Sequence, residues 1–253
     1  METLGASNKR VKLLKSLSHK SARYKEGLVF LEGGRLVRDS ARYGAEVKSV
    51  FYNEGYDGEL FEADESFVLP EKVFDSLTDT VTPQGVCAVA KMPKKSDNVA
   101  EGIKSNLIVL CDNVRDPGNM GTVIRTAHAF GAGALLITEG CTDPFGLKCV
   151  RASMGSVFAI DIVQTDLKKL QLLKEKGWSL AAGILGDDCV PLPKADFSGK
   201  TILAVGSEAD GISDNTAALC DLKVKIPMYN GAESFNAAVA AGIMMYEYRR
   251  QNS

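Results

Sequence analysis

The side chains best suited to chemistry gather in residues 113–127, NVRDPGNMGTVIRTA. The first nine positions hold an Arg, an Asp, a Pro, two Gly and two Asn, and an apolar-periodic segment carrying Arg125 follows. Pro117 and Gly118 predict a turn, and Asn119 is a suitable N-cap for the next helix. A capped helix with a surface arginine would explain the Asn and the Pro, but not the density of polar groups. We therefore favour a functional loop that presents Arg125, a permanent cation, to a ligand.

Two further loops combine glycines with small or acidic polar side chains. VGSEADGIS, residues 205–213, offers main-chain groups and the carboxylate of Glu208, although a plain glycine-rich turn would have a similar sequence. IPMYNGAESFNAAVAAG, residues 226–242, places Ser234 and Asn236 at a helix start, where they either cap the helix or face a pocket. The small residues that follow permit close packing of this helix with or without a function.

These loops belong to strands and helices that alternate from Asn106 onwards. LIVLCD, residues 107–112, is a continuous apolar run of the kind found in strands buried on both faces. Alternating strands and helices predict an α/β fold with a mostly parallel sheet, whose ligands bind beyond the carboxyl ends of the strands. The predicted strands are residues 107–112, 134–138, 157–163, 178–185, 201–206 and 222–228. The predicted helices are one that ends near Phe130 and others in residues 145–155, 166–177, 212–220 and 233–250.

The first part of the chain is interpreted as a separate, small α/β domain. We place this domain at residues 1–90, a polar linker at residues 91–105, and the larger domain at residues 106–253. Residues 1–50 carry eleven Lys or Arg against five Asp or Glu, whereas residues 51–90 carry one Lys against nine acidic residues. This uneven charge is consistent with a basic face for phosphates and equally with an ordinary solvated surface.

Composition excludes several classes of protein. The chain is 45% hydrophobic with a net charge of −2, and it has no apolar run long enough to span a membrane. Its six cysteines form no C-x-x-C pair and it has two histidines, so we expect neither a zinc site nor a disulfide framework. A P-loop motif is absent, and His128 has no evident place in a hydrolase triad.

The N-terminal segment is basic, rich in serine and nearly free of acidic residues. It lacks the apolar core of a secretory signal, and it fits either a short transit peptide or the first helix of a domain. We interpret it as a helix and expect a cytoplasmic protein, with a mitochondrial location as the lesser alternative.

Taken in order, the three loops resemble the SpoU (TrmH-like) RNA ribose 2'-O-methyltransferases of the SPOUT superfamily. The pattern N-x-R-D-P-G-N-x-G-x-x-x-R-T-A, the loop G-S-E-x-x-G-I-S and the ending I-P-M…E-S-x-N-x-A-V-A-A carry this resemblance over residues 107–250. VFLEGGRLVRDS and DTVTPQGVCAV resemble the family's substrate-binding domain in its rRNA-modifying branch. The resemblance implies a trefoil knot in the larger domain, a homodimer and an RNA substrate.

The resemblance also implies S-adenosylmethionine as cofactor, with no metal and no membrane partner. It assigns cofactor contacts to six residues: Gly206, Ser207, Ile226, Met228, Ser234 and Phe235. It assigns catalytic positions to five residues: Asn119, Arg125, Glu208, Ser234 and Asn236. The family usually has Leu in place of Phe235. Its members often have a shorter or a Pro-Gly form of the Y-N-G segment, which affects the shape of the adenine pocket.

The expected reaction is methylation of a ribose 2'-hydroxyl, which must lose its proton while negative charge develops on its oxygen. Because a guanidinium is hardly ever deprotonated in proteins, we assign Arg125 to substrate activation and leave the proton acceptor open. We expect rRNA as substrate, with the large subunit favoured. The alternatives are a tRNA ribose methyltransferase of the same family and a non-catalytic RNA-binding protein.

Overall fold

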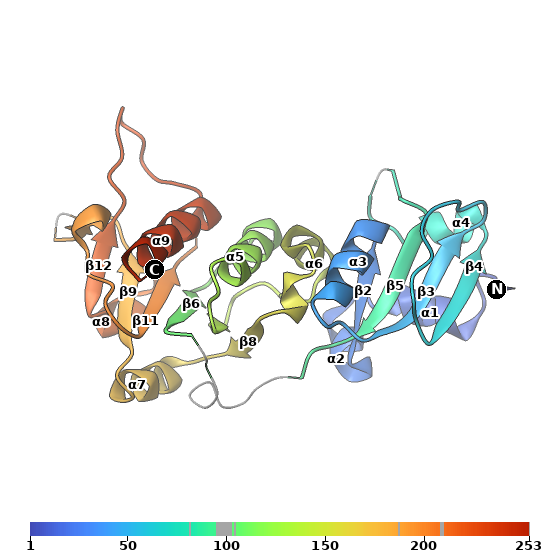
Figure 1. The fold of residues 1–253 in the computed structure, drawn as a ribbon, viewed down its shortest axis with the longest axis horizontal. Coiled ribbons are helices and arrows are strands. Elements are labelled where there is room, and N and C mark those ends of the chain that lie inside the picture. Colours follow the sequence, from blue (N-terminus) through green and yellow to red (C-terminus); the bar gives the residue numbers. More distant parts are fainter. Residues whose placement is uncertain (81, 95–102, 104, 187, 208–209, 253) are drawn as a thin grey trace. The chain divides into compact units, whose positions relative to one another are not determined.

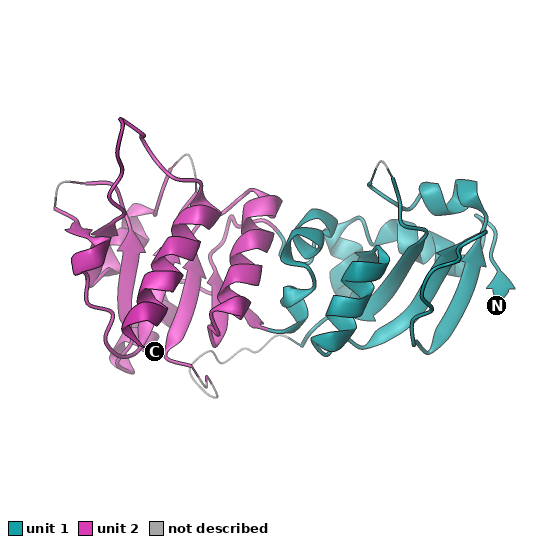
Figure 2. Cartoon of the chain, turned by 45° about the horizontal axis from the view of Figure 1, so that its top comes forward, with its two compact units in different colours: residues 1–94, 143–159 teal, residues 95–142, 160–253 magenta. Residues whose placement is uncertain are grey.

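The computed structural model describes residues 1–80, 82–94, 103, 105–186, 188–207 and 210–252. The chain divides into two compact units, one of residues 1–94 with 143–159 and one of residues 95–142 with 160–253 (Figure 2). Each unit contains a sheet of its own (Figure 1). Each unit also has its own buried apolar cluster.

The first unit is built on a sheet with the strand order β1-β4-β3-β5-β2. β5 is antiparallel to both its neighbours, whereas β4 is parallel to β1 and β3. The strands are β1 (Glu2–Thr3), β2 (Leu28–Glu32), β3 (Val47–Asn53), β4 (Glu65–Leu69) and β5 (Val86–Lys91). The helices are α1 (Lys9–Ser16), α2 (Lys20–Glu26), α3 (Gly34–Arg42), α4 (Glu71–Asp75), α6 (Leu147–Ser153) and the 3-10 turn η1 (Ser156–Phe158). The expectation of a small α/β domain at the N-terminus is confirmed.

A buried ion pair attaches residues 143–159 to the first unit. A guanidinium nitrogen of Arg23 lies 2.5 Å from a carboxylate oxygen of Asp143, and only 4% and 10% of the two side chains are exposed. The Tyr24 hydroxyl donates to the second carboxylate oxygen of Asp143 at 3.0 Å. Gly155 adds a close approach, since a Cβ there would lie 2.9 Å from the backbone nitrogen of Ser40. This segment therefore packs with the N-terminal sheet although it follows β7 of the second unit in the chain.

The second unit is a seven-stranded sheet with the order β10-β12-β9-β11-β6-β7-β8, in which every neighbouring pair is parallel. The strands are β6 (Leu107–Cys111), β7 (Ala134–Ile137), β8 (Asp161–Gln164), β9 (Ser179–Gly183), β10 (Val190–Pro191), β11 (Thr201–Val205) and β12 (Leu222–Lys225). The helices are α5 (Pro117–Ala129), α7 (Leu167–Glu175), α8 (Asp214–Leu219), α9 (Ala237–Gln251) and the 3-10 turn η2 (Leu192–Lys194). The predicted parallel sheet is confirmed.

Helices cover both faces of this sheet. On one face, Ile108 and Leu110 of β6 share an apolar cluster with Leu170 and Leu173 of α7. On the other, α9 packs against α5, β9 and β11. Burial on both faces explains why β6 and β11 are apolar at nearly every position.

Two details of the strand prediction are wrong. The segment expected as a strand at residues 157–163 begins with the 3-10 turn η1, because Gly155 has a φ of 80° and turns the chain before β8. β10 was not predicted, since a two-residue strand carries no periodic signal. The trefoil knot and the domain boundaries at residues 90, 105 and 106 stay predictions.

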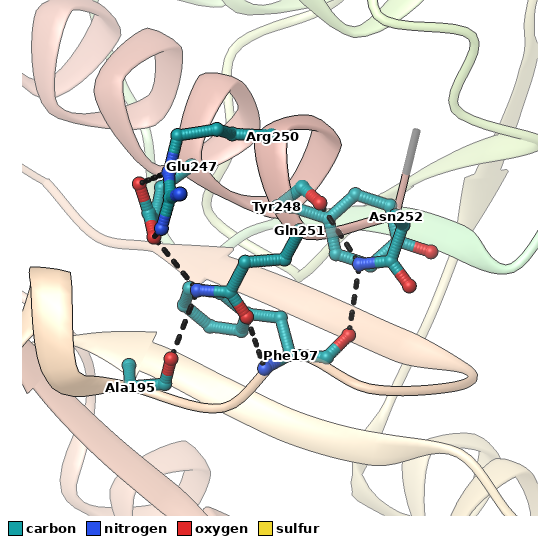
Figure 3. Close-up of polar contacts among 7 residues, drawn as sticks. All are labelled: Ala195, Phe197, Glu247, Tyr248, Arg250, Gln251 and Asn252. Carbon is teal, nitrogen blue, oxygen red and sulfur yellow. Dashed lines mark hydrogen bonds and ion pairs between the residues drawn. The ribbon is translucent and has the colours of Figure 1, made fainter.

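The end of α9 is attached to residues 195–197 by side-chain hydrogen bonds (Figure 3). The Gln251 amide donates to the Ala195 carbonyl at 2.9 Å and accepts from the Phe197 N–H at 3.0 Å. The Asn252 amide donates to the Phe197 carbonyl at 3.1 Å. These contacts fix the position of a helix whose opposite end borders the candidate site.

Candidate active site

The first loop is held by a cap other than the predicted one. Asp116, not Asn119, is the N-cap of α5, and its carboxylate accepts from the Asn119 N–H at 2.7 Å. Pro117 follows at the first helical position, where a missing N–H costs nothing. Asn119 therefore lies inside the first turn, and its side chain does not serve as the cap.

The Asn119 side chain instead joins the first loop to the third. Its carbonyl oxygen accepts a hydrogen bond from the Asn236 amide at 2.9 Å. Asn236 is the N-cap of α9, and its own carbonyl oxygen accepts from the Ala238 and Val239 N–H groups at 3.0 and 3.3 Å. One side chain thus starts a helix with its oxygen and binds a neighbouring loop with its nitrogen.

The second loop depends on a glycine at position 206. Ser207 and Gly211 exchange backbone hydrogen bonds of 3.0 Å in both directions. A Cβ on Gly206 would lie 2.0 Å from the carbonyl carbon of Gly211, so only glycine permits this approach. The Ser207 hydroxyl also accepts from the Asp210 N–H at 3.0 Å. Glu208, predicted from the sequence as catalytic, lies outside the described residues.

A cavity of about 440 Å³ lies at the carboxyl ends of β9, β11 and β12. The structure places all six residues predicted to contact the cofactor in its lining: Gly206, Ser207, Ile226, Met228, Ser234 and Phe235. Its walls mix apolar side chains with backbone, and Asp210, Glu233 and the two serines supply polar groups. Such a mixture of apolar surface and few polar groups is typical of small-molecule sites.

The part of the lining that follows β9 was not predicted from the sequence. Gly183, Ile184 and Leu185 face this cavity, and a Cβ on Gly183 would lie 2.9 Å from the Met244 sulfur. The available signal was the carboxyl end of a predicted strand, which shares an edge with the other loops. That signal identifies an edge of the sheet but not which side chains turn inward.

Arg125 is separate from the cavity. It lies in the third turn of α5 and is exposed, and its side chain makes no hydrogen bond or ion pair with the residues that the structure describes. Gly121, one turn earlier, is buried. The structure therefore joins Asn119 to Asn236 and places Ser234 at the cavity, whereas the Arg125 guanidinium keeps its donors available.

The remaining titratable groups do not suggest another kind of site. Burial lowers the pKa of His128 in the last turn of α5, which favours its uncharged form. Among the described residues, no three His, Cys, Asp or Glu side chains are arranged to hold a metal ion. In the same residues, every helix is too short or too polar to cross a membrane.

Known family models match both parts of the chain. The model of the SpoU rRNA Methylase family matches residues 106–246. The chain belongs to this SpoU family. A second model, described as the MRM3-like substrate binding domain, matches residues 8–88. The resemblance inferred from the three loops is confirmed.

Individual relatives of this SpoU protein modify different RNAs. It is 33% identical to the 23S rRNA (guanosine(2553)-2'-O)-methyltransferase RlmP of Bacillus subtilis, with 96% of this chain and 97% of the relative covered. It is 34% identical to the tRNA (guanosine(18)-2'-O)-methyltransferase of Aquifex aeolicus, over 64% of this chain and 77% of the relative. The AdoMet-bound rRNA methyltransferase of Sinorhizobium meliloti is 30% identical with a TM-score of 0.83, and 98% of each chain is covered.

Proposed function

We propose that this protein is an S-adenosylmethionine-dependent 2'-O-ribose methyltransferase that acts on large-subunit rRNA. The observation that carries the proposal is the cavity at the carboxyl edge of the parallel sheet, lined by the six residues that the SpoU motifs assign to the cofactor.

The cavity suits S-adenosylmethionine in its chemistry. Gly206 and Gly183 keep the backbone close to the cavity, and Ile226 and Met228 add apolar surface for a flat base. Ser207, Ser234 and two carboxylates supply polar groups for ribose and amino-acid atoms. When bound, the cofactor supplies a methyl group that its positive sulfonium already activates.

The chain's own residues have the task of orienting the ribose and stabilising charge. We assign the Arg125 guanidinium to the 2'-oxygen or an adjacent phosphate, where it favours the developing alkoxide. Asn119 and Asn236, joined at 2.9 Å, hold the loop that leads to α5 beside the loop that carries Ser234. Glu208 is proposed to hold Arg125 or the cofactor. No residue is assigned as the proton acceptor.

Exposed lysines on α1 and α2 support RNA as the substrate. The chain has no acidic residue between Glu2 and Glu26, and ion pairs within the described residues leave five exposed lysines unpaired in this stretch. We call them the α1–α2 lysines: Lys9, Lys12, Lys15, Lys20 and Lys25. Several other basic residues of this unit form ion pairs, as Arg10 does with Glu65 and Arg38 with Glu59. Lysines without acidic partners are available for phosphates.

The extent of the matches favours rRNA over tRNA. The rRNA-modifying relative covers 96% of this chain, including the N-terminal unit, whereas the tRNA-modifying relative covers 64%. The bacterial rRNA relative is also the reason to keep the cytoplasm as the proposed compartment.

We further propose that the protein is a homodimer. Exposed apolar side chains on α9 support this, because Val239 and Tyr246, seven residues apart, lie on one helix face and are 50% and 60% exposed. Covering them by a second copy would remove apolar surface from water.

The proposed function is tested by incubating the protein with rRNA and S-adenosylmethionine labelled on its methyl group. We expect label in 2'-O-methylated nucleosides after complete nuclease digestion. Label on a base, or cofactor binding by calorimetry without any transfer to rRNA or tRNA, would contradict it. Absence of cofactor binding would instead favour a non-catalytic RNA-binding protein.

A further inference from the structure

Asp112 is a buried carboxylate that the motifs leave without a function. It directly follows β6 and is only 3% exposed. Its carboxylate oxygens accept three hydrogen bonds, and all three donors are neutral groups. Burying a charge is costly unless its hydrogen bonds are well made, so this position calls for an explanation.

The three hydrogen bonds reach two different elements of the second unit. One oxygen accepts from the Ser213 N–H at 2.8 Å and from the Ser213 hydroxyl at 2.7 Å. The other accepts from the Thr138 hydroxyl at 3.0 Å. Ser213 closes the second loop as the N-cap of α8, and Thr138 follows the end of β7.

The Thr138 and Ser213 hydroxyls both donate their hydrogens to this carboxyl group. Each hydroxyl oxygen is then oriented to accept in turn. The Thr138 oxygen accepts from the Asn113 N–H at 2.9 Å, and the Ser213 oxygen accepts from the Thr216 N–H at 3.4 Å. Asp112 therefore sets the direction of hydrogen bonds into two loops at once.

The bond from Asn113 matters because this residue turns the chain at the start of the first loop. Its φ is 57°, in the left-handed region that asparagine adopts more readily than most non-glycine residues, and a hydrogen bond to its N–H supports the turn. The Thr138 hydroxyl supplies that support at the first residue of the loop leading to Asp116 and Asn119. The course of the first loop therefore depends on Thr138, and through it on Asp112.

We propose that Asp112 is a positioning residue for methyl transfer. It holds the second loop, on the cofactor side, and the first loop, on the substrate side, in fixed positions relative to each other. Through Ser213 it fixes the end of the loop that contributes Gly206 and Ser207 to the cavity. Through Thr138 it fixes the loop that ends at Asn119, which in turn meets Asn236. The proposal rests on the proposed function, since it concerns the same site.

Three variants test the proposal by calorimetric binding of S-adenosylmethionine and by single-turnover methyl transfer to rRNA. Asp112→Asn keeps the size of the side chain but presents an amide N–H₂ where an acceptor is needed. We expect its transfer rate at saturating cofactor to fall at least about tenfold, since a misplacement of about 1 Å can cost on the order of 100-fold.

Two single-arm variants, each lacking one hydroxyl partner of Asp112, test the two loops separately. Ser213→Ala removes the hydroxyl on the cofactor side, which also caps α8, so we expect weaker cofactor binding together with a lower melting temperature. Thr138→Val removes only the hydroxyl on the substrate side, so we expect slower transfer with cofactor affinity within about twofold of wild type. Asp166→Asn is the matched control, because Asp166 caps α7, accepting from the Lys169 N–H at 2.9 Å, and asparagine caps equally well.

The proposal is decided by whether cofactor affinity and the rate of methyl transfer change separately or together. A merely structural role would change both quantities together in all variants, in parallel with the melting temperature, and would overturn the proposal. So would a folded Asp112→Asn protein with wild-type affinity and rate. If Asp112→Asn does not fold, the two single-arm variants decide by the same comparison. If wild type transfers no methyl group to any RNA, the proposed function fails, whereas unchanged cofactor affinity in Ser213→Ala would refute the positioning role.

Discussion

At the scale of single residues, Asn236 shows how one side chain links helix formation to the site. Its oxygen caps α9 and its nitrogen binds Asn119. The Asn236→Asp substitution keeps the capping oxygen but replaces the donor to Asn119 by an acceptor. We expect a stability close to that of wild type and a clear loss of methyl transfer.

Asn236→Ala is the companion variant, measured by urea unfolding and by single-turnover transfer. It removes the cap as well, so unfolding should become easier by about 0.5–2 kcal/mol. Equal activity of Asn236→Asp and wild type would show that the bond to Asn119 has no part in positioning.

Gly206 provides a second test at this scale. Gly206→Ala places a Cβ 2.0 Å from the carbonyl carbon of Gly211, so the second loop must open and cofactor binding should be abolished or strongly weakened. Gly5→Ala is the control, because a Cβ at Gly5 meets no atom within 4 Å. Calorimetry of both variants checks the prediction, and normal affinity of Gly206→Ala would contradict the loop geometry.

Much of the site could be predicted from residue types, but not the contacts between loops. The glycines and serines of the second and third loops indicated a cavity, and the structure gathers them around one. The cap of α5 was missed, because Asp116 and Asn119 are both good capping residues and sequence alone does not rank them. Asp112 was missed because its partners Thr138 and Ser213 lie 26 and 101 residues away in the chain.

At the scale of elements, the α1–α2 lysines can be tested by the salt dependence of RNA binding. We choose the triple substitution of Lys9, Lys12 and Lys15 by glutamine. For every lysine that binds a phosphate, its replacement should reduce the slope of log affinity against log salt by roughly 0.7–0.9. Filter binding over a range of salt concentrations measures this slope.

Lys48→Gln is the matched control, since Lys48 already pairs with Asp64 at 3.1 Å and is less available to phosphates. An unchanged slope in the triple variant would exclude these lysines as the RNA surface. Normal methyl transfer by the same variant would then show that the enzymatic activity does not depend on these lysines.

The attachment of α9 predicts an acid-sensitive contribution to stability. Hydrogen bonds from Arg250, opposed by burial and assisted by Gln251, lower the pKa of Glu247. A carboxyl group whose pKa is lower in the folded than in the unfolded chain stabilises the fold. This contribution is complete at pH values above the pKa in the unfolded chain, and it disappears as the pH falls through the pKa in the folded chain.

We therefore expect this contribution to be complete above the ordinary glutamate pKa of 4.5 and to decline below it. Urea unfolding of wild type and Glu247→Gln across this range is the measurement. The difference in the free energy of unfolding between the two proteins should shrink as the solution becomes more acidic. A difference that stays constant with pH would contradict the role of this carboxylate.

At the scale of the whole molecule, the fold class followed from the alternation of strands and helices and from apolar runs such as residues 107–111. The placement of residues 143–159 did not follow. Their apolar pattern shows that α6 is buried but not which sheet buries it, and the deciding pair, Arg23 and Asp143, spans 120 residues. A pattern within one segment carries no information on such a long-range contact.

The central claim is that the first and third loops and Arg125 act together in methyl transfer from a cofactor in the cavity. The most direct test is single-turnover transfer of labelled methyl to rRNA by wild type, Arg125→Ala and Arg125→Lys, with cofactor affinity measured in parallel.

Because Arg125 lies outside the cavity lining, we expect both variants to bind S-adenosylmethionine normally. The Arg125→Ala rate should fall by about 100-fold or more, as when a single oxyanion donor is removed. Arg125→Lys should be intermediate, since it keeps the charge but not the paired donors. A wild-type rate in Arg125→Ala, with normal cofactor binding, would contradict the account.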